Sequence, residues 1–358
     1  MVRSAALLCV LLLAACGGDK SSIRVINAST AVYEVPSPAS GTVVKPIARY
    51  NGRGSLVLHG GGVVQHEIAA DIIALAGPDP RLCLIDTADG HGDIYRVFDE
   101  FRAVHLLAFN LQPGDAGRPD VVAALRGCTG FFFGGGAPQR LSDTFRPGGR
   151  DTPALAAIRE RFQKHGAVVS GASAGAMAVG PVMLCECGAR SSVEAVTRGE
   201  LFRAPGLDLL NEPVLVDAHF FTHGLLGRHM FALARDRIPV GVGIDEDTAV
   251  LVPGNGGPWL VLAGKSVAVV RMPGDARTNS LHDFGISILS PGDRFDPATN
   301  DIRVASKRQR LASDSIPIGW PIADGIKYSF STTADTADYG NSQRVETTLN
   351  RLVSVDPP

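Results

Sequence analysis

Short apolar runs alternate with stretches of helical periodicity between residues 54 and 254, and this alternation restricts the fold more than any other feature. Each apolar run has the length of a strand and is followed by glycine or polar turn residues. The predicted strands are 55–59, 81–86, 104–109, 130–133, the run from Val168, 212–220, 240–244 and 249–252. Because strands separated by helices pair in parallel, the pattern predicts an α/β protein with a doubly wound parallel sheet.

The predicted helices lie between these runs, at 68–76, 94–101, 121–125, 155–162 and 225–234. The second has the most regular spacing, with Ile94, Val97, Phe98 and Phe101 at positions i, i+3, i+4 and i+7. The chain has 41 glycines among 358 residues, which suits the many tight turns of such a fold. A chain of this length is able to bury a sizeable core.

The run from Val168 continues into Gly171-Ala172-Ser173-Ala174-Gly175, which has the G-x-S-x-G form of a nucleophile elbow. In an elbow the serine occupies a strained turn between a strand and a helix, so its neighbours must be small. The amide of Ala174 would point to where an oxyanion forms, helped by the dipole of the following helix. A glycine-rich helix N-terminus capped by Ser173 has the same form, so the motif alone does not show whether Ser173 is a nucleophile or a helix cap.

Active-site groups of a parallel sheet gather beyond the carboxyl ends of its strands. The glycine turns at 60–62 and 134–136 follow two predicted strands, so we expect them at the same edge as Ser173. His219 ends an apolar run and is the best candidate base for the serine, while His223 remains a rival because it is so near. This convergence favours a catalytic serine over a simple helix cap.

The first residues are predicted to be a targeting segment. Arg3 precedes an apolar run that is too short to span a membrane, and Leu13-Ala14-Ala15-Cys16-Gly17 resembles a bacterial lipobox. This resemblance implies cleavage after Ala15 and lipidation of Cys16. We expect a signal peptide at 1–15, a lipid-anchored tether with room for one edge strand at 16–50, and an exported protein held at the cell envelope.

Beyond about residue 255 the sequence changes to short strands with glycine and proline turns. We therefore expect an α/β domain at 51–254 and a small β-rich C-terminal extension at 255–358. Cys83 and Cys128 lie in or beside apolar runs and are predicted to be buried small hydrophobes. Cys185-Glu186-Cys187 lacks the spacing and the second pair of a zinc site, although a disulfide there stays open.

Four motifs occur in order along the chain. They are Phe132-Phe133-Gly134-Gly135-Gly136 with Gln139, Gly171-Ala172-Ser173-Ala174-Gly175-Ala176, Asp217-Ala218-His219-Phe220 with Gly227-Arg228, and Gly243-Ile244-Asp245-Glu246-Asp247-Thr248-Ala249. Their order and spacing resemble the cyanophycinase family, which includes the aspartyl dipeptidase called peptidase E. The resemblance covers about residues 54 to 295. It implies the flavodoxin-like fold of class I glutamine amidotransferases, with a serine in place of their cysteine.

The resemblance also implies roles for individual residues. Ser173 is the expected nucleophile and His219 the expected base. The oxyanion donors that it implies are the backbone amides of Ala174, Gly135 and Gly136. The substrate-binding residues that it implies are Gln139, Asp217 and Arg228.

The third member of the triad is expected between the serine and the histidine. An acid there would hold the imidazole tautomer and stabilise imidazolium. Glu194 has the spacing closest to that of the family and is our predicted acid. Glu186 and Glu200 remain rivals.

Several departures from the family concern substrate recognition. Cyanophycinase has glutamine before the histidine, where this chain has Ala218, and two of its substrate-binding arginines fall at His223 and Leu225. Neither residue reproduces the bidentate fork with which a guanidinium binds a carboxylate. Gln139 is also displaced from the glycines by Ala137-Pro138. We therefore expect hydrolysis of short acidic or isoaspartyl peptides, with cyanophycin, whose arginine is joined to the aspartate β-carboxyl, a poor substrate.

The leading hypothesis is a lipid-anchored serine peptidase or isopeptidase that forms an acyl-enzyme on Ser173. The alternatives are a non-catalytic amidotransferase-like binding protein and an esterase that uses the same elbow. We expect no cofactor and no metal. The expected partners are a small peptide substrate and, through the lipid, a membrane. The net charge of −2 and the lack of a Lys/Arg run argue against a nucleic-acid partner, and a homodimer stays open.

Overall fold

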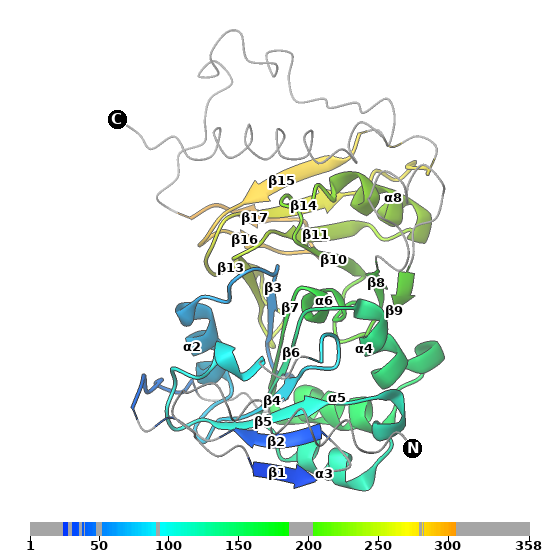
Figure 1. Ribbon diagram of the computed structural model, residues 1–358. Helices are drawn as coiled ribbons and strands as arrows, with labels where there is room; N and C mark the ends of the chain where they lie inside the picture. The colour runs from blue at the N-terminus through cyan, green and yellow to red at the C-terminus, as the bar shows by residue number, and fades with distance from the viewer. Residues whose placement is uncertain are drawn as a thin grey trace.

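The computed structural model describes residues 24–27, 31–35, 38, 40–47, 52–90, 94–185, 203–278, 281 and 283–305. Most of the described strands belong to two sheets, a larger one that extends upward from the bottom of Figure 1 and a smaller one in its upper part. The larger sheet contains β1 (Arg24–Asn27), β2 (Ala31–Val35), β3 (Leu56–His59), β4 (Arg81–Ile85), β5 (His105–Asn110), β6 (Gly130–Phe133), β7 (Val168–Ala172), β12 (Ala249–Val252), β13 (Trp259–Val261), β16 (Arg294–Phe295) and β17 (Ile302–Arg303). The smaller sheet contains β10 (Val214–Ala218), β11 (Val240–Ile244), β14 (Val267–Arg271) and β15 (Gly285–Leu289), while β8 (Val182–Leu184) and β9 (Arg203–Pro205) form a separate pair.

The described helices are α2 (His66–Leu75), α3 (Pro119–Arg126), α4 (Pro138–Phe145), α5 (Pro153–His165), α6 (Ala174–Met177) and α8 (Leu226–Asp236), with short 3₁₀ turns η2 (Ile94–Val97), η3 (Pro113–Asp115) and η4 (Pro147–Gly149). The N-terminus of α5 is capped by the side chain of Thr152, and Gly166 ends the helix in the left-handed conformation.

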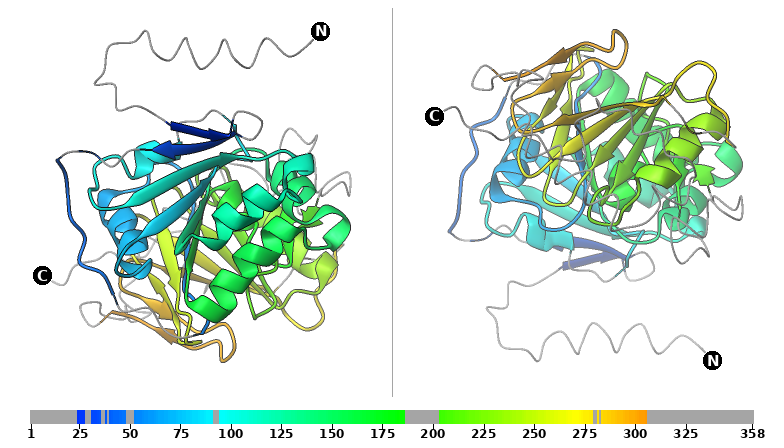
Figure 2. Two further views of the ribbon diagram at one scale, coloured as in Figure 1. Left: turned by 90° about the horizontal axis from the view of Figure 1, so that it is seen from below. Right: turned by 90° about the horizontal axis from the view of Figure 1, so that it is seen from above.

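The centre of the larger sheet is parallel, in the order β5-β4-β6-β7-β3. Its strands are buried on both faces, which explains why they are continuously apolar in the sequence. Leu82 and Leu84 pack with the apolar face of α2, whereas Cys83 and Ile85 pack with α3 and α5. Figure 2 shows the sheet between these two helix layers. The predicted α/β class with a doubly wound parallel sheet is thus confirmed.

The larger sheet is mixed rather than wholly parallel, because antiparallel β2 and β12 flank the parallel centre. The predicted strands at 212–220 and 240–244 do not extend this sheet. They form β10 and β11, the parallel pair of the smaller sheet. β12 returns to the larger sheet, where it pairs with β3, so the β11–β12 connection passes from one sheet to the other.

Strands from both ends of the described chain complete these sheets. Residues 24–27 and 31–35, expected within a tether with one edge strand, form two strands, and β2 pairs with β5. In the expected extension, β13, β16 and β17 continue the larger sheet, while β14 and β15 continue the smaller one. The strand-rich character of this C-terminal region is confirmed, but its described strands are integrated into the sheets. Residues 1–23, which include Cys16, lie outside the described residues.

Two local predictions need correction. The helix expected at 94–101 is only the short turn η2 (Ile94–Val97), and β5 begins at His105. Phe98 and Phe101 nevertheless point into the core and are 0% and 1% exposed. Cys83 and Cys128, expected as buried small hydrophobes, are buried at 0% exposure, but they form a disulfide that joins β4 to the end of α3, and Cys185 is disulfide-bonded as well. Among the described residues, no helix is long and apolar enough to span a membrane.

Candidate active site

Ser173 lies at a strained turn between β7 and α6. Its φ of 54° and ψ of −118° are rare for a residue with a side chain, as the elbow motif predicts. The two glycines of the motif are needed for close packing, because a Cβ on Gly171 would collide with Gly175, and one on Gly175 would collide with the carbonyl of Phe133. The local sequence therefore places the serine hydroxyl at the carboxyl end of the central strands.

His219 faces the serine. Its Nε2 lies 2.8 Å from Ser173 Oγ, and its Nδ1 lies 2.7 Å from Oε1 of Glu246. His219 also has a positive φ, of 52°, and its ring packs over Gly61, where any Cβ would collide with the imidazole. The structure thus brings together the two predicted residues Ser173 and His219, and the three side chains form a continuous hydrogen-bonded chain.

The carboxylate beside His219 is not at one of the positions predicted for the acid. The carboxylate bonded to His219 belongs to Glu246, which follows the histidine in the chain instead of preceding it. The predicted acid Glu194 and its rivals Glu186 and Glu200 lie outside the described residues. A sequence signal for Glu246 did exist, since Asp245-Glu246-Asp247 directly follows a buried strand at the edge where parallel strands present active-site groups.

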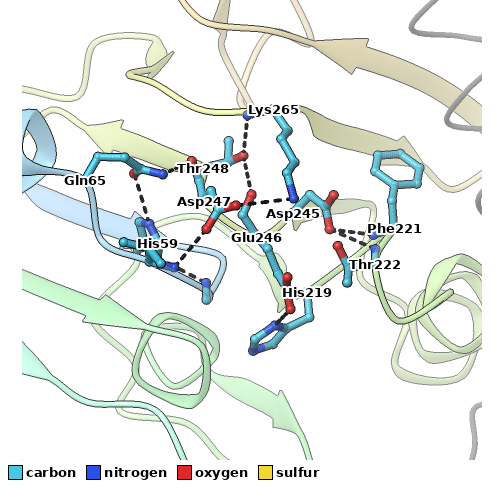
Figure 3. A network of polar contacts seen from close by, with 12 residues as sticks. His59, Gln65, His219, Phe221, Thr222, Asp245, Glu246, Asp247, Thr248 and Lys265 are labelled. Carbon is cyan, nitrogen blue, oxygen red and sulfur yellow. Dashed lines mark hydrogen bonds and ion pairs between the residues drawn. The ribbon is translucent and has the colours of Figure 1, made fainter.

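The three acidic residues of the β11–β12 loop have separate tasks. Asp245 is 2% exposed, and its Oδ1 accepts the amides of Phe221 and Thr222, which holds the turn that follows His219. Asp247 Oδ1 accepts the amide of Val63, and these bonds are drawn in Figure 3. That amide, with the cationic Lys265 nearby, keeps the pKa of Asp247 below its ordinary value. The loop is therefore held on both sides of Glu246.

His223 is stacked on the candidate base. Its ring is 4.5 Å from that of His219 and nearly parallel to it, at 7°, and its Nε2 lies 3.7 Å from Glu246 Oε1. These three side chains present potential ligand atoms within 4.8 Å of one another. Imidazole lone pairs lie in the ring plane, so two parallel rings do not converge on a common ion. The arrangement suits stacking better than metal chelation.

Of the predicted oxyanion donors, Gly135 and Ala174 lie next to the serine. Gly135 is adjacent to Ser173, because a Cβ on Gly135 would lie 3.2 Å from the serine Cβ. Ala174 is the first residue of α6, where an amide has no acceptor within the helix. Gly136 has a φ of 123° and packs against the carbonyl of Ala88. Because α6 has only four residues, its dipole adds less than the sequence argument assumed.

Asp217 and Arg228 do not have the exposure expected of substrate-binding residues. Asp217 is 0% exposed and Arg228 5% exposed, and the guanidinium binds the carboxylate through two hydrogen bonds of 2.7 and 3.3 Å. Burial by itself would raise the pKa of Asp217, but the charges and hydrogen bonds of Arg228 and His229 together outweigh it, and the pKa lies below its ordinary value. The prediction of substrate contacts is therefore corrected to an internal ion pair between β10 and α8.

Gln139 lies in the first turn of α4 and is partly exposed. Its amide donates to Asp143 at 2.7 Å, one turn further along the helix. Asp143 also lines a cavity of about 410 Å³ between α4 and the end of β5, together with Arg140 and Thr144 of the same helix. Neither Ser173 nor His219 lines this cavity, so it is separate from the triad.

No family model matches the sequence. The chain is 33% identical to the cyanophycinase of a Nostoc species over 216 residues, which cover 57% of this chain and 69% of the relative. It is 28% identical to the cyanophycinase of Synechococcus elongatus over 295 residues, which cover 76% of this chain and 88% of the relative.

The fold is similar to that of a crystal structure of a peptidase from an acI-B1 Actinobacterium. The TM-score is 0.51 at 22% identity, and the similarity covers 69% of this chain and 98% of the other. At this identity the likeness supports the fold alone. Taken with the cyanophycinase relatives, the ordered motifs and the described site show that this chain belongs to the cyanophycinase family of peptidases.

Proposed function

We propose that the chain is a serine peptidase that cleaves short aspartyl or β-aspartyl peptides through an acyl-enzyme on Ser173. The observation that carries this proposal is the continuous chain of hydrogen bonds from Ser173 Oγ through His219 to Glu246. An ionised carboxylate only accepts hydrogen bonds, so the neutral imidazole carries its proton on Nδ1. The lone pair of Nε2 then faces the serine hydroxyl, as a general base requires.

In the first half of the reaction, Ser173 Oγ attacks the carbonyl carbon and its proton passes to His219 Nε2. The imidazolium is stabilised by Glu246, and the oxyanion accepts hydrogen bonds from the amides of Ala174 and the 135–136 turn. When the tetrahedral intermediate collapses, the C–N bond breaks and the leaving amine takes the proton from Nε2. The acyl group remains on the serine as an ester.

In the second half, water attacks the ester and gives its proton to His219 Nε2. Collapse of the second intermediate breaks the C–O bond to Ser173, and Nε2 returns the proton to the serine. The products are a carboxylic acid and an amine. These steps require no group other than the described side chains, backbone amides and water.

The proposed substrate class rests on the family and on the residues around the triad. The relatives are named cyanophycinase. In this chain, however, Arg228 is already paired with Asp217, and Leu225 is buried, so neither is poised to bind a substrate carboxylate. His223, half exposed beside the triad, supplies one single-point donor in place of a guanidinium fork. We therefore expect short acidic peptides to be better substrates than cyanophycin.

The activity is tested by fluorophosphonate labelling of Ser173, followed by rates on a panel of α-aspartyl and β-aspartyl dipeptides, including β-aspartyl-arginine, with matched esters. Labelling of Ser173 and turnover of at least one acidic dipeptide are the expected results. A protein that is folded but neither labelled nor active on any dipeptide would refute the proposal. A rate on β-aspartyl-arginine that clearly exceeds all others would refute the substrate preference.

We also propose that the protein is exported and anchored through a lipidated Cys16. The lipobox-like sequence supports this, and so does the Cys83–Cys128 disulfide, because disulfides persist mainly in oxidising compartments. The intact mass of membrane-extracted protein tests it. Cleavage at another position, or an unmodified N-terminus, would refute the anchor.

A further inference from the structure

The turn that follows β3 contacts every segment of the triad. Three backbone hydrogen bonds make these contacts: Ser173 N to His59 O (2.9 Å), His219 N to Gly60 O (2.7 Å) and Asp247 N to Gly61 O (2.8 Å). The nucleophile, the base and the loop of the acid therefore share one support. Any movement of this turn would change the distances between all three catalytic side chains.

The turn has little stiffness of its own. Gly61 has a φ of 100° and must be glycine, because a Cβ there would collide with the ring of His219. Glycine leaves the backbone with more conformational freedom than any other residue. The conformation is held instead by the side chain of His59, whose Nδ1 accepts the amide of Gly61 at 3.1 Å.

The same ring connects the turn to the acid loop. Because Gly61 donates to Nδ1, the proton of the neutral ring is on Nε2, which lies 3.4 Å from Oε1 of Gln65. The amide nitrogen of Gln65 in turn donates to the carbonyl of Asp247 at 2.7 Å. Figure 3 shows this path from the histidine to the residue next to Glu246.

Burial of His59 favours the neutral ring, whose Nδ1 is able to accept a hydrogen bond. His59 is 1% exposed, and burial lowers its pKa, although the Gln65 bond and the Asp247 charge partly oppose that shift. A protonated ring would place an N–H donor on Nδ1 directly against the amide of Gly61. Neutral His59 satisfies both the amide and Gln65, whereas the charged form would break the bond that holds the turn.

We propose that His59 is a positioning residue of the active site, whose Nδ1 acceptor holds Gly61 and thereby the relative placement of Ser173, His219 and Glu246. The rate measurements that test this rest on the proposed serine peptidase activity. The proposed role depends on the Nδ1 acceptor of His59 and not on the volume that the ring fills. It is thus separable from simple core packing.

Two substitutions distinguish the acceptor from the volume. His59→Asn keeps an acceptor, since its Oδ1 reaches close to the position of Nδ1, while His59→Phe keeps a ring and has no acceptor. We expect His59→Phe to reduce the rate of fluorophosphonate labelling and kcat by about 10²-fold, the scale of a small catalytic misplacement, with KM changed less than about threefold. The rate of His59→Asn should be lower than that of wild type by at most about tenfold. Equal losses in two folded variants, or no loss in His59→Phe, would overturn the proposal.

Nitrogen NMR of histidine-labelled protein tests the inference without catalysis. Wild-type His59 should show the Nε2–H tautomer, and the downfield proton of His219 Nδ1 should persist in His59→Asn but shift or disappear in His59→Phe. The opposite tautomer for His59 overturns the proposal even if neither variant folds. If wild-type protein neither labels nor hydrolyses, the proposed function fails, while these spectra still decide the role of His59.

Discussion

Replacing Glu246 with glutamine removes a charge and leaves the shape of the side chain nearly unchanged. The carboxylate lies 2.7 Å from His219 Nδ1, and both side chains are mostly buried, at 22% and 25% exposure. At that separation the attraction between unit charges is about 6 kcal/mol for an effective dielectric of about 20, and about 1.5 kcal/mol in bulk water. In the proposed mechanism imidazolium forms as His219 takes the serine proton, so this attraction acts on the transition state.

Losing an attraction of this size would lower the rate by between about tenfold and about 10⁴-fold, at about 1.4 kcal/mol for each factor of ten. Partial burial places the site between the limits, and we expect Glu246→Gln to lower kcat by about 10² to 10³-fold. KM should change little, because Glu246 interacts with the base and not with the substrate. The amide also permits the wrong imidazole tautomer, which adds to the loss.

The assay is initial-rate kinetics on the best dipeptide, with fluorophosphonate labelling as a substrate-free readout. Asp247→Asn is the matched control, because it removes a carboxylate from the same loop and retains an oxygen acceptor for the amide of Val63. We expect the control to lose less than about tenfold, since its side chain does not contact the base. A Glu246→Gln variant with nearly normal kcat, together with an inactive Glu194→Gln variant, would refute our assignment of the acid.

Four further outcomes are expected. Ser173→Ala should abolish labelling and lower hydrolysis by about 10³-fold or more, and substantial residual turnover would exclude an acyl-enzyme on this serine. Gly61→Ala should inactivate the protein by displacing the His219 ring. Gly256 also has a positive φ but has open space around it, so Gly256→Ala should remain active. Equal activities of the two variants would contradict the steric argument. Asp217→Ala should lower the free energy of unfolding in urea by about 3–5 kcal/mol, because it leaves Arg228 buried without that charge, and a loss below about 1 kcal/mol would disprove a structural ion pair. Burial lowers the pKa of His59, so at low pH the unfolded chain binds a proton that the folded chain does not. The stabilisation should therefore be complete above about pH 6.5 and decrease as the pH falls. Thermal unfolding should show a smaller decrease for His59→Asn.

The central strands and the positions of Ser173 and His219 were predictable because their signals are local. A strand buried on both faces must be continuously apolar, so β3, β6 and β7 are visible as runs in the sequence. The elbow requires small residues around Ser173, and the sharp turn at the carboxyl end of β10 places His219. The 94–101 segment shows the limit of such patterns, since its helical spacing reflects buried Phe98 and Phe101 rather than a helix.

The remaining features depend on which strands become neighbours, and the sequence by itself does not specify that. Glu246 reaches His219 only because β11 lies beside β10 in one sheet while β12 pairs with β3 in the other. Cys83 and Cys128 meet because β4 and β6 are adjacent, and Asp217 is turned to Arg228 because α8 packs over the smaller sheet. Chain order and spacing predicted the fold class and the pairing of Ser173 with His219 that the structure shows. Tertiary structure decided the contact of Glu246 with His219, the disulfide and the internal ion pair, because hydrogen bonds and charges act over a few ångströms of space regardless of separation along the chain.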